Sequence, residues 1–361
     1  MKDLHSPFAG SYAEARVKFL RAATDAGLSI RSHEHPERGR EGETLAIDVA
    51  LQGPKDAAAM LVISSGCHGI EGFCGSAVQV ALIRDQSWLD QASANGLAVL
   101  YIHALNPHGF SWLRRVTHEN VDLNRNFVDF SRELPRNLGY DDIAHLAVPP
   151  DWPLSEAVIA EAQRYIADRG FAAFIAALSG GQYHHPQGQM YGGQQPCWSN
   201  LVLRQVLREH ARDVEQLGWI DIHTGLGPCG HGERIFFNQN DATALARTRS
   251  WWGPAVTSYY DGSSDSAPLS GNLWCGIRDE CPQAEYTGIA LEFGTLHYEK
   301  VMLALTADHW LHLQTATYPS VASRIRQEMI EAFFVDTAEW KEAVLTQTFC
   351  AAAQAVVALR R

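Results

Sequence analysis

The feature that most constrains the fold is a strand–loop–helix pattern around residues 60–83. The apolar run Met60-Leu61-Val62-Ile63 is typical of a strand that is buried on both faces of a sheet. Residues 75–83 have the composition of a helix, and a second apolar run follows at residues 97–103. A strand, a helix and a strand in this order predict parallel pairing with a right-handed crossover. The chain is therefore expected to be an α/β protein.

The loop after the first of these strands carries His68 and Glu71 among glycines that allow a sharp turn. It follows the carboxyl end of the strand, where open α/β sheets bind ligands. An imidazole and a carboxylate this close can be aimed at one point, and they would supply two of the three ligands of a His/Glu/His zinc site. Such pairs also occur by chance: His210 and Asp213 form another, which we interpret as part of a solvated helix. The pair needs support from elsewhere in the chain.

Two later strands carry further ionisable residues near their carboxyl ends. Residues 219–225 are predicted to form a strand that ends in a loop, which gives His223 a position like that of His68. An apolar strand over residues 288–295 is interrupted by Glu292. A carboxylate in such a strand is costly unless it is paired, metal-bound or catalytic. These strand ends are therefore candidates for the missing parts of a site.

Composition and charge restrict the partners. The net charge of −12 argues against nucleic acids and anionic membrane surfaces as partners. Neither a signal peptide nor an apolar stretch long enough to span a bilayer is expected. The seven cysteines lack Cys-x-x-Cys spacing and indicate reduced thiols, so a cytoplasmic location is expected.

The chain shows neither an internal repeat nor a linker that clearly divides it, so residues 1–361 are predicted to form a single domain. A segment at about 128–215 is longer than a catalytic core needs and is expected to shape the pocket. A half-buried edge strand is expected at residues 45–51, and a helix at residues 199–217. A helical tail at about 337–361 is expected to pack on the core and could form a contact in a homo-oligomer.

The order of the candidate residues along the chain can be compared with that of known enzyme families. The ordered set is His68 and Glu71, Arg115, Asn124 and Arg125, His223, and Glu292. This order resembles the M14 zinc carboxypeptidases and the related aspartoacylase/succinylglutamate desuccinylase deacylases. The strings around these residues are closer still to an M14-like bacterial group called DUF2817, and the resemblance extends to roughly residue 335. It implies a mixed, mostly parallel twisted sheet with helices on both faces, as in zinc carboxypeptidases.

The resemblance implies a role for each residue at the strand ends. His68, Glu71 and His223 would bind one zinc ion and leave a fourth position for water, whose pKa zinc lowers to about 7. Glu292 would be the general base that takes the proton of this water and passes it to the leaving nitrogen. Arg115 would stabilise the oxyanion of the tetrahedral intermediate.

The polar stretch around residues 120–127 would bind the substrate. From its composition alone, it could be either a solvated loop or a pocket wall for an anion, because arginine offers a two-pronged fork to carboxylates. The resemblance implies that Asn124 and Arg125 hold a substrate carboxylate. It also implies that Asp122 orients the first ligand histidine, His68.

The residues alone do not decide which tyrosine and which histidine line the pocket. The family places a mobile tyrosine over the substrate, ahead of the general base in the sequence. Tyr259, Tyr260 and Tyr286 are candidates, and no spacing decides between them. His184 and His185 are adjacent in a long loop, so at most one of them would face a site, and His184 is the candidate wall residue.

The function that the resemblance implies is hydrolysis, by a zinc enzyme, of an amide bond next to a carboxylate in a small molecule or short peptide. A large insertion indicates an enclosed pocket, which favours small substrates. A carboxypeptidase and an N-acyl amino acid deacylase are both retained. Two rival interpretations are a metal-free binding protein and a two-metal hydrolase in which His184 or Asp122 supplies a further ligand.

Overall fold

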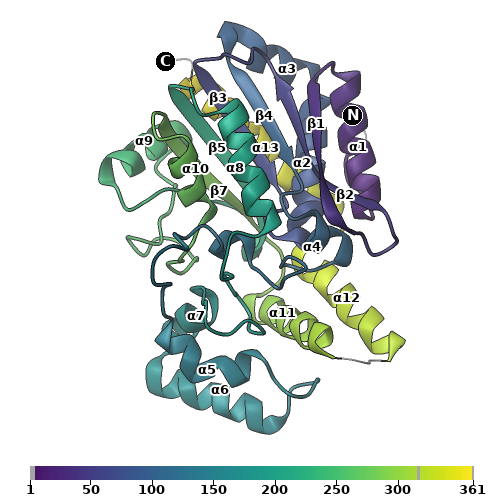
Figure 1. Cartoon of the computed structure of the whole chain (residues 1–361), viewed down its shortest axis with the longest axis vertical. Coiled ribbons are helices and arrows are strands. Elements are labelled where there is room, and N and C mark those ends of the chain that lie inside the picture. Colours follow the sequence, from purple (N-terminus) through teal and green to yellow (C-terminus); the bar gives the residue numbers. More distant parts are fainter. Residues whose placement is uncertain (1–4, 315–317, 360–361) are drawn as a thin grey trace.

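The computed structural model describes residues 5–314 and 318–359, and its centre is a mixed seven-stranded sheet in the order β1-β2-β4-β3-β5-β7-β6 (Figure 1). The strands are β1 (Ser29–Arg38), β2 (Thr44–Gln52), β3 (Ala59–Ser65), β4 (Ala98–His103), β5 (Gln216–Cys229), β6 (Gly232–Phe236) and β7 (Glu285–Gly294). The pairings give β2 and β6 one direction and the other strands the opposite direction. The mixed, mostly parallel sheet is thus confirmed.

Helices cover both faces of the sheet, as predicted. One face is covered by α1 (Tyr12–Asp25), α2 (Gly72–Ile83) and α13 (Ala338–Leu359), and the other by α8 (Trp198–His210) and α10 (Leu273–Glu280). The side chains of β3 alternate between two hydrophobic cores: Leu61 and Ile63 pack in the first, Met60 and Val62 in the second. Burial on both faces explains why this strand is a continuous apolar run.

A further layer of helices, drawn at the bottom of Figure 1, comes from the middle of the chain. It contains α5 (Leu138–Ala147), α6 (Glu156–Arg169) and α7 (Phe171–Ser179). These helices pack through their own apolar core, which includes Tyr140, Ile143 and Leu178, and Met302 packs against it. The other helices are α3 (Gln86–Ser93), α4 (Pro107–Trp112), α9 (Ala242–Trp252), α11 (Tyr298–Leu313) and α12 (Pro319–Phe333).

Two sequence expectations about secondary structure are wrong. Residues 45–51 are not a half-buried edge strand, because β2 is buried along most of its length and β1 pairs with it on the outer side. The charged segment that forms β1 carries too little alternation to be recognised as a strand. The helix expected over residues 199–217 ends at His210, since β5 already begins at Gln216. The described cysteines are all free thiols, as expected.

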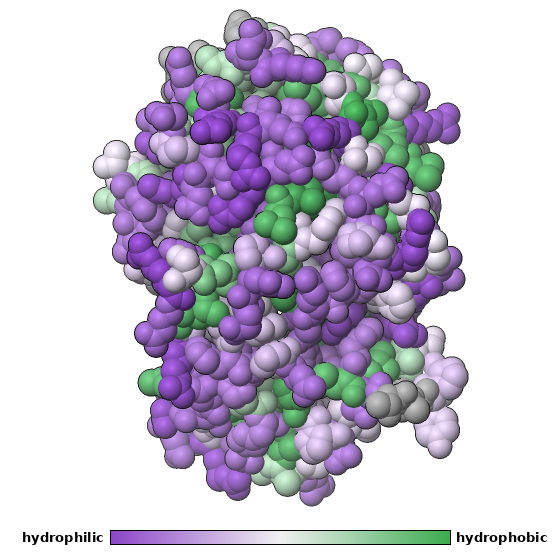
Figure 2. Space-filling model, in the orientation of Figure 1, coloured by the Kyte–Doolittle hydropathy of each residue, from purple (hydrophilic) through white to green (hydrophobic). Residues whose placement is uncertain are grey.

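The C-terminal helix α13 was predicted as a tail, and residues 360–361 lie outside the described residues. Contrary to the expectation from sequence, it is long and apolar enough to cross a membrane by length and composition, with a mean hydropathy of 1.4 in an 18-residue window. Its side chains at Val344, Ala351 and Ala355 are buried in the core, which accounts for this apolar character. The surface seen in Figure 2 is mostly hydrophilic, with hydrophobic residues in small patches.

Candidate active site

Strand pairing brings three distant segments to one edge of the sheet. β3 and β5 pair with Ser65 opposite Ile222, so the loop after β3 starts beside His223. β5 and β7 pair with His223 opposite Glu292. The carboxyl ends of parallel strands are the usual ligand-binding edge of such sheets. The register of the sheet therefore sets the distance between the candidate base and a candidate ligand.

The loop between β3 and α2 is held against the segment that carries Arg115. The N–H of Gly69 donates to the carbonyl of Arg115 (3.1 Å), and the N–H of Ile70 donates to the carbonyl of Arg114 (2.9 Å). A Cβ on Gly69 would lie 2.1 Å from the backbone of Gly109 in α4, so this approach requires glycine. The backbone thus fixes where His68 and its neighbours can point.

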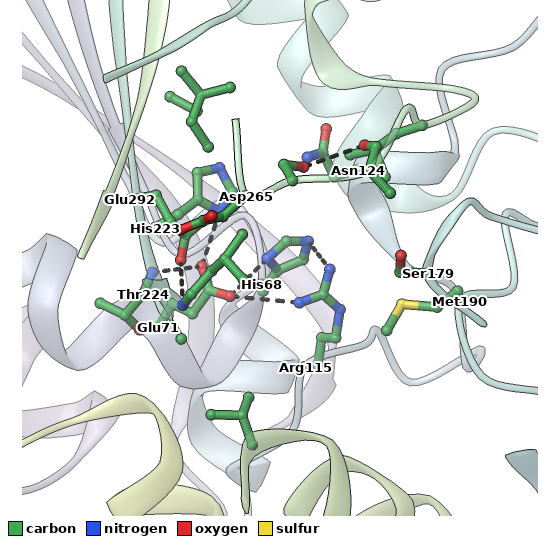
Figure 3. A pocket seen from close by; sticks show the side chains of 18 of the residues that line it. His68, Glu71, Arg115, Asn124, Ser179, Met190, His223, Thr224, Asp265 and Glu292 are labelled. Atoms are coloured by element: carbon green, nitrogen blue, oxygen red, sulfur yellow. Dashed lines mark hydrogen bonds and ion pairs between the residues drawn. The ribbon is translucent and has the colours of Figure 1, made fainter. Parts of the chain in front are cut away.

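The three predicted metal ligands converge. Nδ1 of His68 lies 2.8 Å from Oε1 of Glu71, and Nδ1 of His223 lies 2.9 Å from Oε2 of the same carboxylate. One ligand atom from each residue lies within 4.8 Å of the others (Figure 3). Two imidazoles and one carboxylate that face a common point have the composition of a catalytic zinc site with three protein ligands.

The other nitrogen of each imidazole faces a buried carboxylate. Nε2 of His223 lies 2.7 Å from Oδ2 of Asp221, and Nε2 of His68 lies 3.4 Å from Oδ1 of Asp122. Carboxylates in this position orient ligating histidines and make them better ligands. Asp122 was expected in this position from the sequence, whereas Asp221 was not. Asp221 could have been recognised from the sequence, because it lies two residues before His223 and residues two apart on a strand share a face.

The charges around these ligands shift their pKa values. Burial raises the pKa of Glu71, but the imidazoles of His68 and His223 outweigh it and hold the value at about 2. Burial lowers the pKa of His223, but the carboxylates of Asp221 and Glu71 raise it well above its usual value. Burial likewise opposes ionisation of Asp122, yet the guanidinium of Arg115 keeps its pKa well below the usual range. The cluster thus keeps its carboxylates charged, which suits the binding of a cation.

Glu292 has the opposite environment. It is half-buried, and its Oε1 accepts a hydrogen bond from the backbone N–H of Leu226 (3.2 Å). Burial, followed by the nearby charge of Glu71, raises the pKa of Glu292 to about 8. Two carboxyl groups in one site with pKa values pushed in opposite directions are typical of a division between binding and acid–base roles.

The two arginines of the site have different partners. Arg115 donates to Oδ2 of Asp122 through Nε (2.9 Å), and its Nη2 lies 2.8 Å from Nε2 of His68. Arg125 is buried, and its guanidinium donates to the backbone carbonyls of Ser179 (2.7 Å from Nη2) and Asn124 (2.9 Å from Nη1). Within the described ranges, no carboxylate lies within 4.0 Å of Arg125. A buried cation held only by neutral groups is suited to receive an anion.

Asn124, like Arg125, is oriented by a hydrogen bond between its side chain and the backbone. Its Oδ1 accepts a hydrogen bond from the N–H of Leu273 (2.9 Å), so its side-chain carbonyl is already used. Its side-chain N–H groups therefore remain as donors beside Arg125. Both side chains line the cavity that contains the ligand cluster.

This cavity of about 140 Å³ gathers seven of the predicted site residues. They are His68, Glu71, Arg115, Asn124, Arg125, His223 and Glu292. Asp122 lies behind them and is fully buried. The rest of the wall includes side chains from α7 and α11, which belong to segments outside the sheet.

Two predicted tyrosines and a histidine do not line this cavity. Tyr286 is buried at the start of β7, and its position faces a separate polar hollow. Tyr260 is on the surface, 37% exposed, and packs on Tyr259, which does line the cavity. His184 lines a different hollow together with His185. Tyr260 and His184 belong to irregular segments, and the sequence does not show how such segments fold back on the sheet. Tyr286 lies near the start of β7, whereas Glu292 lies near its end.

The structure adds a tyrosine that the sequence analysis did not consider. Tyr298, at the start of α11, lines the cavity, and its buried hydroxyl has no hydrogen-bond partner in the described part of the chain. It follows Glu292 in the sequence, whereas the candidates were sought ahead of that residue. A buried hydroxyl without a partner at a cavity wall is available to a ligand.

Solved structures with a similar course of the chain include bovine thrombin-activatable fibrinolysis inhibitor, at 12% identity, with 94% of this chain and 98% of that chain covered and a TM-score of 0.45. Another is a metallo-carboxypeptidase from Pseudomonas aeruginosa, at 12% identity, with 92% and 68% covered and a TM-score of 0.40. No curated protein matches the sequence. The sequence model of the DUF2817 family, described as a protein of unknown function, matches residues 8–347, and the chain therefore belongs to the DUF2817 family.

Proposed function

We propose that this protein is a zinc-dependent hydrolase that cleaves an amide bond next to a carboxylate in a small substrate. The observation that carries the proposal is the convergence of His68, Glu71 and His223, with ligand atoms within 4.8 Å of one another in the cavity that also contains Glu292 and Arg125. A metal site, a candidate base and an anion receptor are the parts that such a reaction needs.

The donor set fits zinc. Both imidazoles present Nδ1 to the carboxylate of Glu71, while their other nitrogens face Asp122 and Asp221. Two histidines and one carboxylate leave a fourth position free for water or substrate. When bound, zinc supplies Lewis-acid chemistry and water that is ionised near neutral pH. Calcium and magnesium prefer oxygen ligands, so the imidazoles argue against them.

The remaining side chains divide the other tasks. Glu292 would take a proton from the attacking water and deliver it to the leaving nitrogen, because it lies in the cavity of the ligand cluster, where a bound cation would keep its carboxylate ionised and able to accept a proton. Arg115 would bind the oxygen on which negative charge develops. Asn124 and Arg125 would hold the substrate carboxylate and so fix the position of the amide bond.

Metal analysis and hydrolysis assays test this proposal together. The purified protein is expected to contain about one zinc per chain and to hydrolyse N-acyl amino acids or C-terminal dipeptides. A chelator should abolish turnover and added zinc should restore it. His223→Ala should lose both zinc and activity, whereas His184→Ala, in a separate hollow, should keep both. Zinc well below one per chain, or turnover that survives His223→Ala, would exclude the proposal.

A further inference from the structure

The cavity that contains the ligand cluster adjoins a second, larger hollow of about 900 Å³, which we call the vestibule. The two share six lining residues: Ile175, Leu226, Asp265, Ser266, Ala267 and Tyr298. Arg125, Asn124 and the metal ligands line only the inner cavity. A substrate whose carboxylate is held at Arg125 would therefore reach the vestibule only with the part that extends beyond the inner cavity.

The vestibule begins beside the candidate base. Leu226, a shared wall residue, donates its backbone N–H to Glu292 (3.2 Å). Residues 226–229 follow the ligand His223 at the end of β5, and residues 295–298 follow Glu292 at the end of β7. The part of the substrate that lies beyond the scissile bond, away from the held carboxylate, would emerge here.

The walls of the vestibule are largely apolar. Helix α7 contributes Phe171, Ala172, Ile175 and Ala176, and the segment after β7 contributes Leu296. Phe171 is 51% exposed although it is a large aromatic residue, and its ring meets that of Tyr298 edge-on at 6.2 Å. An exposed aromatic side chain at the mouth of a buried site is a typical ligand contact.

The charges of the vestibule disfavour a second anion. Among its described lining residues there is no lysine or arginine, the only carboxylate is Asp265, and the one imidazole, that of His297, lies 3.8 Å from the carboxylate of Glu299. Asp265 is exposed, and no ion pair within 4.0 Å involves it in the described part of the chain. It stands on the wall that the vestibule shares with the inner cavity. An acyl group with its own carboxylate would meet this charge with no lysine or arginine to offset it.

We propose that the vestibule selects an uncharged, apolar acyl group of about four or more carbons on the acyl side of the scissile bond. This inference rests on the proposed function and narrows its substrate class to amino acids with an apolar N-acyl group. The reaction is R–CO–NH–CHR′–COO⁻ + H₂O → R–COO⁻ + ⁺H₃N–CHR′–COO⁻, in which the C–N bond breaks and a C–O bond forms. R occupies the vestibule, and the carboxylate of the amine part lies at Arg125.

The test compares acyl groups on the zinc-loaded protein. The substrates are N-acetyl, N-butanoyl, N-hexanoyl and N-succinyl derivatives of L-alanine and L-phenylalanine. Each methylene removed from water contributes up to about fourfold, so kcat/KM is expected to rise at least tenfold from acetyl to hexanoyl. Succinyl should fall below butanoyl, and Asp265→Asn should reduce that gap by about two- to fivefold.

A matched pair of variants locates the effect. Phe171→Ala should lower the hexanoyl-to-acetyl ratio of kcat/KM about threefold or more, because it removes an apolar wall. Leu201→Ala on α8, where Leu201 is 55% exposed and lines none of these hollows, should leave the ratio unchanged. An unchanged ratio in Phe171→Ala would overturn the assignment of the acyl group to the vestibule.

Calorimetric binding of the same compounds to zinc-loaded Glu292→Gln separates this inference from the proposed function. Hydrolysis with no preference for the longer acyl groups would overturn the inference and leave the hydrolase. Tighter binding of hexanoyl than acetyl compounds without turnover by the unmodified protein would support the apolar site and overturn the hydrolase. Neither binding nor turnover of any compound would overturn both.

Discussion

The inner cavity and the vestibule are built in different ways. The candidate metal ligands and the candidate base of the inner cavity come from strand ends and from the loop after β3, although α7 and α11 complete its wall, and these ligands are buried and lie close to other charged groups. The vestibule is lined by α7 and by irregular segments, and it presents apolar side chains, one of which is an exposed phenylalanine. Strand register fixes the relative positions of the candidate ligands and base. The helices and loops outside the sheet can change in sequence without disturbing these positions, so they can set substrate selectivity.

The largest effect expected within the inner cavity comes from Glu292→Gln. The amide keeps the size of the side chain but cannot take a proton, so kcat should fall about 10³-fold or more. Zinc content should remain near one per chain, because Glu292 is not among the converging ligands. Rates and metal analysis on the same preparation check this. Activity within tenfold of the unmodified protein would remove Glu292 from the mechanism.

The next effect concerns the grip on the substrate. Arg125→Ala removes a buried cation that has no carboxylate partner among the described residues, so kcat/KM should fall about 10²-fold for substrates with a carboxylate. Arg125→Lys should recover only part of this loss, since lysine lacks the planar fork. The control substrate is the corresponding amide, which has no carboxylate. An equal loss on the amide would show that Arg125 is structural and does not bind the anion.

Asp221→Asn addresses the support of the metal ligands. The carboxylate lies 2.7 Å from Nε2 of His223, and Ser64 Oγ lies 2.6 Å from its other oxygen. Loss of its charge should weaken zinc affinity about 10- to 100-fold, measured by competition with a chelator. Asp261→Asn is the matched control, because Asp261 is an exposed aspartate in a distant loop that pairs with Arg249. Equal zinc affinity in both variants would deny Asp221 this role.

The sequence predicted the inner cavity well and its surroundings poorly, for a physical reason. His68, His223 and Glu292 could be placed because buried parallel strands have a recognisable apolar pattern and all end at the same edge of the sheet. Asp221 was missed although its alternation with His223 along β5 was visible. The mixed fold followed from the same strand pattern together with the family resemblance.

The walls of the vestibule had no such pattern. Tyr298 and Phe171 come from helices whose placement depends on packing with distant segments, as in the apolar core formed by α5, α6 and α7. Tyr260 and His184, which were predicted to line the cavity, lie outside it for the same reason. Local composition can indicate that an irregular segment shapes a pocket, but it cannot indicate which side chains of the segment face it.

The smallest expected effect is on the stability of the metal-free protein. It tests whether burial of the ionised carboxylate of Glu292 in the inner cavity destabilises the folded state. The folded protein raises the pKa of Glu292 to about 8, from 4.5 for the free side chain. The folded state therefore retains a proton that the unfolded state releases, so the stability of the chelator-treated protein should fall as pH rises from about 4.5 to 8. Glu292→Gln has no carboxyl group at this position, so its stability should not fall with pH for this reason. Its Tm should equal that of the unmodified apoprotein near pH 4.5 and exceed it by about 2–5 °C at pH 9.

Zinc is the control for this pH dependence. A bound cation stabilises the ionised carboxylate, so the difference in Tm between Glu292→Gln and the unmodified protein should shrink or vanish when both are loaded with zinc. A pH-independent difference for Glu292→Gln in the apoprotein would mean that Glu292 is ionised there as easily as a surface carboxylate. The inner cavity would then not differ from the vestibule in the free-energy cost of ionising a carboxylate.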